Sequence, residues 1–174
     1  FGSSHFGSSS HSGSHPRVCK DSERERERGS PPSQSAMSAV KGKVLECKGL
    51  RNADFFGKSD PFVRVSLEAQ DGTVYAESKT ASKTDNLDPV WEDEPFNFAH
   101  DDCYDGNIRF RVMDTGLGPD EELGEALVPV KLIPMLKDGD SPTGFSFSLG
   151  IRRKKSTGVI KVTLGVVPKP GLFG

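Results

Sequence analysis

The sequence predicts an all-β fold, an antiparallel sandwich of eight short strands, and three observations support this prediction. Short runs of apolar and β-branched residues recur along most of the chain, several of them alternating with polar residues at period two. Clusters of Gly, Pro, Asp and Asn separate the runs and are typical of turns. Only residues 131–137 have a helical pattern, and Pro134 limits it to about one turn. This combination favours two packed antiparallel sheets.

The clearest strand is 108–112, in which apolar residues occupy one face and two arginines the other. Asp71-Gly72 is a hairpin signal between two further runs. The expected strands, in order, are residues 39–47, 61–67, 73–76, 96–98, 108–112, 123–130, 145–149 and 159–164.

The chain divides by composition into a folded domain and two flanking segments. Residues 1–36 contain almost no large aliphatic side chains and are rich in Ser, Gly, His, Arg and Glu, so we expect a disordered tail or linker. Residues 37–167 have ordinary apolar content, and about 130 residues are enough to form a core. Residues 168–174 are expected to be a C-terminal linker.

Composition also narrows the function classes. A formal net charge of −2 argues against a nucleic-acid-binding protein held by phosphate contacts. The three cysteines form no disulfide framework, and no apolar run approaches the ~20 residues of a membrane span. No secretory signal, nucleophile motif or phosphate-binding glycine loop is visible. We therefore expect a cytoplasmic, monomeric domain that is not itself an enzyme. Its only link to catalysis would be as the targeting module of a larger catalytic chain.

Three blocks of sequence share one family pattern. The first, residues 50–65, contains a Leu, an Asp and then Gly-Lys-Ser-Asp-Pro-Phe-Val. The second contains Lys79-Thr80, residues 86–92 (NLDPVWE) and 96–98 (FNF), and the third contains 110–114 (FRVMD) with Leu123-Gly124. Over residues 38–166 the chain resembles a C2 domain. This resemblance implies a sandwich with three loops at one end that bind Ca²⁺ and touch phospholipid. It also favours the type II strand arrangement, because the run at 158–164 closes the domain.

The resemblance implies a calcium site at the first and third loops. Asp54 and Asp60 bracket the first loop, and Asp114 ends the strand before the third. Ca²⁺ takes six to eight oxygen ligands, for which several carboxylates near one point are suited. The third loop departs from the family, because Gly116 replaces its second Asp and the loop is one residue short. Either Asp120 or Glu121 is then the last ligand, and we expect one weak Ca²⁺ site.

Apolar and basic residues near these loops predict contact with a membrane. Phe55 and Phe56 at the first loop and Leu117 on the third are candidate lipid-inserting residues, although the two phenylalanines could instead fold back as a small core. Candidate basic residues are Arg152, Arg153, Lys154 and Lys155, which equally suit a solvated turn, together with Lys79 and Lys83 beside Arg64 and Lys58.

The sequence thus predicts a peripheral module that binds an anionic phospholipid surface through its loops, influenced by a weak Ca²⁺ site. The alternative is a calcium-independent interaction or scaffold domain with a protein partner.

Overall fold

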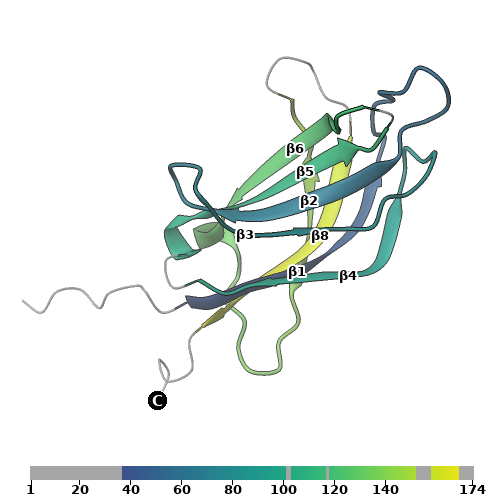
Figure 1. Cartoon of the computed structure of the whole chain (residues 1–174). Helices are drawn as coiled ribbons and strands as arrows, with labels where there is room; N and C mark the ends of the chain where they lie inside the picture. Colours follow the sequence, from purple (N-terminus) through teal and green to yellow (C-terminus); the bar gives the residue numbers. More distant parts are fainter. Residues whose placement is uncertain (1–36, 101–102, 117, 152–157, 169–174) are drawn as a thin grey trace, which may run out of the picture. The chain divides into compact units, whose positions relative to one another are not determined.

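The computed structural model describes residues 37–100, 103–116, 118–151 and 158–168, and these form a β-sandwich (Figure 1). Two single-turn 3₁₀ helices, η1 and η2, lie between strands. In chain order the elements are β1 (Met37–Lys48), β2 (Pro61–Glu68), β3 (Val74–Lys79), β4 (Val90–Phe98), η1 (Cys103–Asp105), β5 (Asn107–Asp114), β6 (Glu121–Pro129), η2 (Val130–Leu132), β7 (Thr143–Ser148) and β8 (Val159–Pro168).

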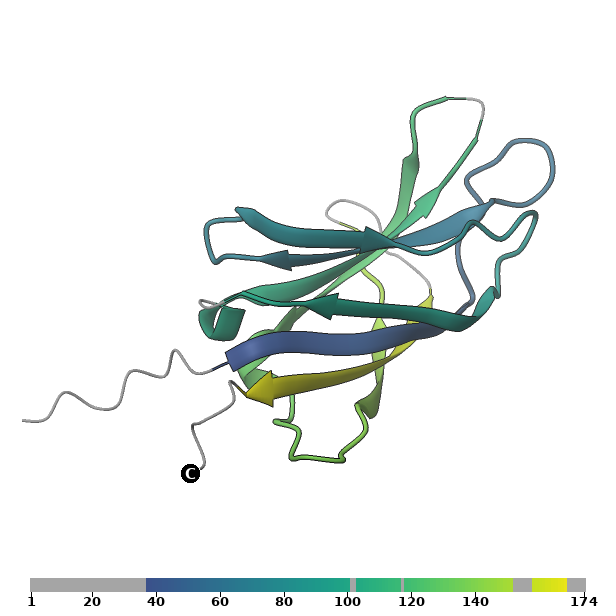
Figure 2. The ribbon, with the colours of Figure 1, turned by 60° about the horizontal axis from the view of Figure 1, so that its bottom comes forward.

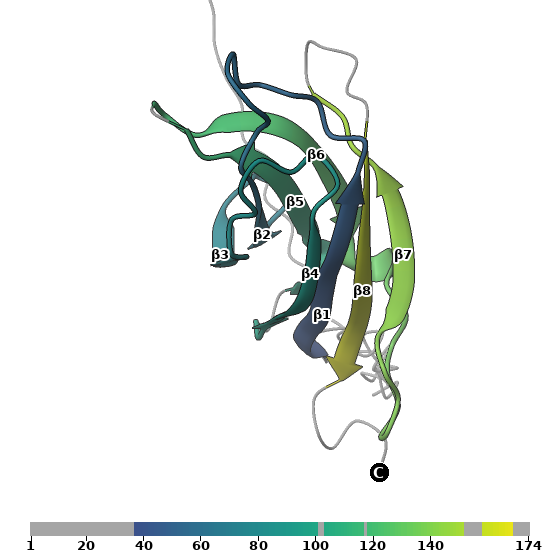
Figure 3. The same cartoon turned by 90° about the vertical axis from the view of Figure 1, so that its right-hand side faces the viewer.

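Two four-stranded antiparallel sheets face each other, as the side view of Figure 3 shows. One has the order β4-β1-β8-β7 and the other β3-β2-β5-β6. The predicted eight-stranded sandwich is confirmed, and β8 pairs with β1, as the expected type II arrangement requires. The fourth strand begins at Val90, earlier than the predicted 96–98, because its pairing with β1 runs on to Glu46.

The core lies between the inner faces of the sheets. Along β5 buried and half-buried residues alternate, which puts Ile108, Phe110 and Val112 inside. Trp91 at the start of β4 is almost fully buried, and its Nε1 donates to the carbonyl oxygen of Ala81 at 2.7 Å. The Trp91 ring thereby also fixes the segment between β3 and β4.

The outer face of the second sheet contains a buried ion network that joins three strands. Glu68 of β2 is only 2% exposed and accepts hydrogen bonds from Ser66 Oγ at 2.7 Å and Arg109 Nε at 2.8 Å. Arg109 of β5 also donates to Glu125 of β6 at 2.7 Å. Burial raises the pKa of Glu68, but the Ser66 and Arg109 contacts outweigh it and hold that pKa below its usual 4.5. The network therefore stabilises the pairing of β2, β5 and β6.

Three connecting segments lie together at one end of the sandwich, the right-hand end in Figure 2. They are residues 49–60, 80–89 and the described part of 115–120, and the start of β1 and the end of β8 lie at the opposite end. In the described part of the chain, no helix has the length and apolar character needed to span a membrane.

Replacing Arg109 with methionine should lower the free energy of unfolding by about 2 to 3 kcal/mol at pH 7, because Glu68 stays buried without its main partner. Since the folded-state pKa of Glu68 is depressed, its stabilising effect is present above pH 4.5 and is lost as the pH falls below that value. Urea unfolding at pH 7 and pH 3 should therefore show that Arg109→Met lowers the free energy of unfolding by less at pH 3 than at pH 7.

The matched control is Lys43→Met, which removes an ion pair with Asp93 in which both side chains are well exposed. Its effect should stay below about 0.5 kcal/mol. An Arg109 variant as stable as this control would show that the network adds nothing to the sheet.

Candidate functional site: an acidic loop cluster beside two exposed phenylalanines

The loop between β1 and β2 is shaped by hydrogen bonds between its own side chains and backbone. Asn52 Oδ1 accepts from the backbone N–H of Ser59 at 2.9 Å, and Asn52 Nδ2 donates to the Gly57 carbonyl at 2.8 Å. Ser59 Oγ in turn accepts from the N–H of Ala53 at 2.9 Å. These bonds close the base of the loop, so that the residues from Asp54 to Gly57 form its tip.

Aspartates from all three loops are joined by hydrogen bonds to backbone groups. Asp114 is 3% exposed, and its Oδ1 accepts from the N–H of Asp60 at 2.7 Å. Asp60 Oδ1 accepts from the N–H of Asp85 at 2.6 Å. Asp85 Oδ1 accepts from the N–H of Lys58 at 2.5 Å. This chain of bonds fixes Asp60 and Asp114 next to each other and adds Asp85, from the loop between β3 and β4, to the group.

Asp54 lies within the electrostatic field of the same group. Its pKa is raised above 3.8, first by burial and then by the negative charges of Asp114, Asp60, Glu121 and Asp85. Gly116 lies beside it, because a Cβ built on Gly116 would be 3.6 Å from Asp54 Oδ1. Asp54, Asp60 and Asp114, the candidates from the sequence, therefore lie in one group, and Asp85 joins them.

The donor set suits a hard cation, although its side chains are not arranged as a finished site. Carboxylate oxygens are the ligands that Ca²⁺ prefers, and the hydrogen bonds above use only Oδ1 of Asp60 and Asp114. Within the described ranges, no three His, Cys, Asp or Glu side chains form a ready metal-binding group. A cation would thus need side-chain rotations to gather its ligands, and the assignment of these aspartates as ligands stays a prediction.

The two candidates for the last ligand, Asp120 and Glu121, point to different surroundings. Glu121 pairs with Asp114 across the β5–β6 ladder, and its charge acts on Asp54. Asp120 Oδ2 instead lies 3.7 Å from Arg64 Nη2 on the outer sheet face. The geometry therefore favours Glu121 as the carboxylate nearer the cluster, where the sequence left both open.

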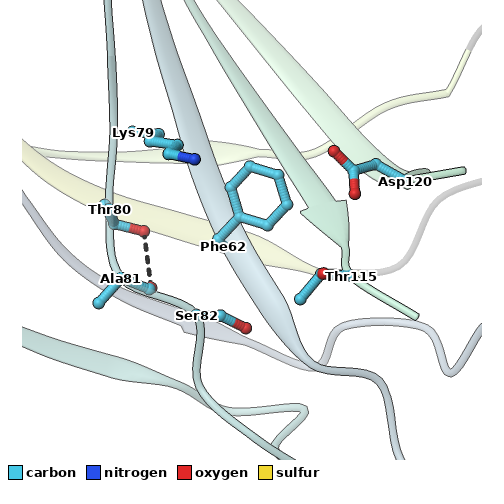
Figure 4. Close-up of a pocket in the computed structure, with 7 residues that line it drawn as sticks. All are labelled: Phe62, Lys79, Thr80, Ala81, Ser82, Thr115 and Asp120. Atoms are coloured by element: carbon cyan, nitrogen blue, oxygen red, sulfur yellow. Dashed lines mark hydrogen bonds between the residues drawn. The ribbon is translucent and has the colours of Figure 1, made fainter. Parts of the chain in front are cut away.

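A hollow of about 350 Å³ lies next to Asp120, with the Phe62 ring between the Lys79 ammonium and the Asp120 carboxylate (Figure 4). Thr80, Ala81, Ser82 and Thr115 complete its lining. Lys79 is exposed here, whereas Lys83, four residues later, is half-buried and does not line the hollow. Arg64 is shared between Asp120 and Glu77, at 3.7 and 3.6 Å. The predicted basic face thus carries carboxylates as well as cations.

Phe55 and Phe56 are 92% and 88% exposed at the tip of the first loop. Their ring centroids are 4.9 Å apart in an edge-to-face arrangement, so the rings touch each other without being covered by the sandwich. Of the two alternatives open in the sequence, the exposed one is observed. Leu117 and the basic run Arg152, Arg153, Lys154 and Lys155 lie outside the described residues.

Sequence reasoning missed Asp85 and Arg51 as members of the site. Asp85 has a left-handed backbone with φ 54°, which Asp tolerates, and was hidden in a turn-rich segment. The clustering of three loops at one end was itself predicted, so a carboxylate in the second loop, between β3 and β4, could have been identified as a candidate member of the site. Arg51 gave no signal, because its contact with Glu121 joins residues 70 positions apart.

Comparison with known proteins decides the family. The family model for the C2 domain matches residues 38–146, which is more than half of the chain. This chain belongs to the C2 domain family. Synaptotagmin-4 of Arabidopsis thaliana is 34% identical to this C2 domain over 94 residues, 53% of the chain and 16% of the relative. A calcium-dependent lipid-binding protein of the same plant is 31% identical over 87 residues, 50% of the chain and 16% of the relative.

Solved structures agree with this C2 assignment. A C2 domain of a plant extended synaptotagmin 1 superposes with a TM-score of 0.64 at 30% identity, covering 76% of this chain and 96% of that domain. A human cytosolic phospholipase A2 in complex with a fluorophosphonate inhibitor and terbium chloride superposes with a TM-score of 0.62 at 21% identity, covering 78% of this chain and 18% of the enzyme, and shows the shared fold. The curated relatives are several times longer than the region matched.

Replacing Asp54 with asparagine should raise the melting temperature of this C2 domain in chelator at pH 7. The folded state holds the Asp54 pKa above 3.8, so ionisation of Asp54 opposes folding at neutral pH and not below about pH 3.8. Thermal melts across pH 3 to 7 should show the gain at neutral pH and its disappearance in acid.

Asp138→Asn is the control, because Asp138 is exposed in the segment between η2 and β7. It should leave the melting temperature unchanged at both pH values. A loss of stability in Asp54→Asn at pH 7 would mean that its carboxylate makes a structural contact that outweighs the repulsion.

Proposed function

We propose that this C2 domain is a peripheral membrane-binding module that attaches to anionic phospholipid through its loops and is assisted by one weakly bound Ca²⁺. The observation that carries the proposal is the pair of exposed phenylalanines at the tip of the loop that also holds Asp54 and Asp60. Exposed aromatic side chains at a loop tip can enter the boundary between headgroups and acyl chains. The task of the domain is then binding at the cytoplasmic face of a membrane, and not catalysis.

Charge explains why a cation would assist. The cluster contains Asp54, Asp60, Asp85 and Asp114, and such a group is repelled by an anionic lipid surface. Bound Ca²⁺ would neutralise part of this charge and offer open coordination positions to a lipid phosphate oxygen. Neutralising the cluster would let Phe55 and Phe56 reach the bilayer.

The missing carboxylate at Gly116 explains why the site would be weak. Gly116 lies beside Asp54, in a place where an additional carboxylate would join the cluster. Fewer carboxylates lower the affinity for Ca²⁺ and favour one ion over two. The same observation supports the second candidate, a calcium-independent interaction domain, and the experiments below separate the two.

Replacing both Phe55 and Phe56 with serine should weaken binding to vesicles that contain phosphatidylserine by tenfold or more in the presence of Ca²⁺. Fully burying one phenylalanine contributes about 1.5 to 3 kcal/mol, and about 1.4 kcal/mol is a factor of ten. Because both rings are exposed, the substitution should leave folding intact. Co-sedimentation with vesicles measures the change.

Leu132→Ser is the matched control, since Leu132 is an exposed apolar side chain on η2, outside the three loops. It should bind vesicles as the parent does. Equal binding by the double phenylalanine variant and the Leu132 variant would contradict insertion of the first loop.

Calcium titration by calorimetry should show one ion bound to the parent and no binding heat in Asp60→Asn. Asparagine keeps the oxygen that accepts from the N–H of Asp85 but removes the charge, so the variant tests the ligand role without breaking the loop.

Gly116→Asp should tighten Ca²⁺ binding by about tenfold or add a second ion, because it adds a carboxylate to the cluster. The substitution fits the fold, because the Gly116 backbone lies outside the left-handed region and its Cβ has room.

Absence of heat in both the parent and Gly116→Asp would contradict the calcium site. If the parent still bound vesicles in chelator under those conditions, the calcium-independent interpretation would replace the calcium-assisted one.

A further inference from the structure

An arginine from the first loop connects it to the strand that follows the third loop. Arg51 lies three residues before Asp54, and its Nη2 donates to Glu121 Oε1 at 2.6 Å. The same nitrogen donates to the carbonyl oxygen of Glu122 at 2.7 Å. One guanidinium nitrogen thus binds both a side chain and the backbone at the start of β6.

The position of Arg51 is set by packing as well as by these bonds. Its side chain is 23% exposed, and its Nε is buried without a hydrogen-bond partner in the described part of the chain. A mobile surface arginine would turn this nitrogen toward water, because a buried donor without a partner costs free energy. The Arg51 side chain is therefore partly buried as well as hydrogen-bonded, and its guanidinium lies against Glu121.

Glu121 is the group for which Arg51 and a loop-bound cation would compete. It lies opposite Asp114 in the β5–β6 ladder, and its negative charge reaches Asp54. A cation held by Asp54, Asp60 and Asp114 would attract this carboxylate as a further ligand. In the structure Glu121 instead pairs with a cation that the chain itself supplies.

We propose that Arg51 is a resident counter-cation of the loop cluster: it holds the start of β6 against the first loop without calcium, and it competes with calcium for Glu121. The competition rests on the proposed function, whereas the contact between the two segments does not. Arg51 is a positioning residue here, and it contributes to the weak affinity expected of the site together with Gly116.

The first test needs no calcium. Urea unfolding in chelator of the parent, Arg51→Gln, Glu121→Gln and the double variant forms a double-mutant cycle. The proposal expects each single variant to be less stable than the parent, and the double variant to be more stable than the sum of the two losses predicts. Additive losses within error would overturn the contact as a source of stability.

The second test measures calcium affinity by calorimetry on the same four proteins. Arg51→Gln should bind Ca²⁺ roughly fivefold more tightly, because it removes the ion pair that competes for Glu121 and a positive charge near the site. Adding Glu121→Gln to this variant should reverse much of the gain. Global destabilisation only lowers the population of folded protein that can bind, and so cannot raise apparent affinity, which means that a merely structural role for Arg51 does not predict this increase.

Lys43→Gln is the control, since it likewise removes a cation paired with a carboxylate, here that of Asp93, but lies in the middle of β1. It should leave calcium affinity unchanged. Equal Ca²⁺ affinities of Arg51→Gln and the double variant would show that calcium does not bind Glu121, and would overturn the competition between Arg51 and calcium. Absence of calcium binding in all variants would overturn both the competition and the calcium part of the proposed function. If Arg51 and Glu121 were still energetically coupled in chelator, the contact between the two segments would remain supported.

Discussion

The register of β5 between β2 and β6 is the constraint on which the loop end depends. Pro61 lies opposite Asp114 in one ladder, and Asp114 lies opposite Glu121 in the other. This alignment brings the N–H of Asp60 to Asp114 Oδ1, and the N–H of Thr115 to the Asp60 carbonyl at 3.2 Å. A shift of one residue would turn the Asp114 side chain to the other sheet face and separate the two loops.

The same three strands carry the buried network of Glu68, Arg109 and Glu125. Its location matters, because the carboxylates gathered at the loop end raise the pKa of Asp54, so that its ionisation opposes folding. A network that joins β2, β5 and β6 away from the loops can hold the register while the loops tolerate this repulsion. Backbone donors and Arg51 offset part of it locally, and we infer that a bound cation would offset more.

Much of this arrangement follows from local sequence. Alternation along 108–112 and the turn residues between runs predicted the strands, because side-chain period and turn chemistry act over a few residues. The motif around Gly57-Lys58-Ser59-Asp60-Pro61 located Asp54 and Asp60 and, with the third loop, Asp114. The length of β4 was underestimated, since its first half is fixed by pairing with β1 and not by its own alternation.

By itself, then, the sequence determined the fold class, the loop aspartates and the two tip phenylalanines as candidates. Only the tertiary structure decided that Phe55 and Phe56 are exposed, that Asp85 joins the cluster, and that Glu121 rather than Asp120 lies nearer to Asp54. The pairing of Arg51 with Glu121 likewise joins residues far apart in the chain. The physical reason is common to all of these: each depends on which loops the sheet register places side by side, and that is a property of the packed strands rather than of any one segment.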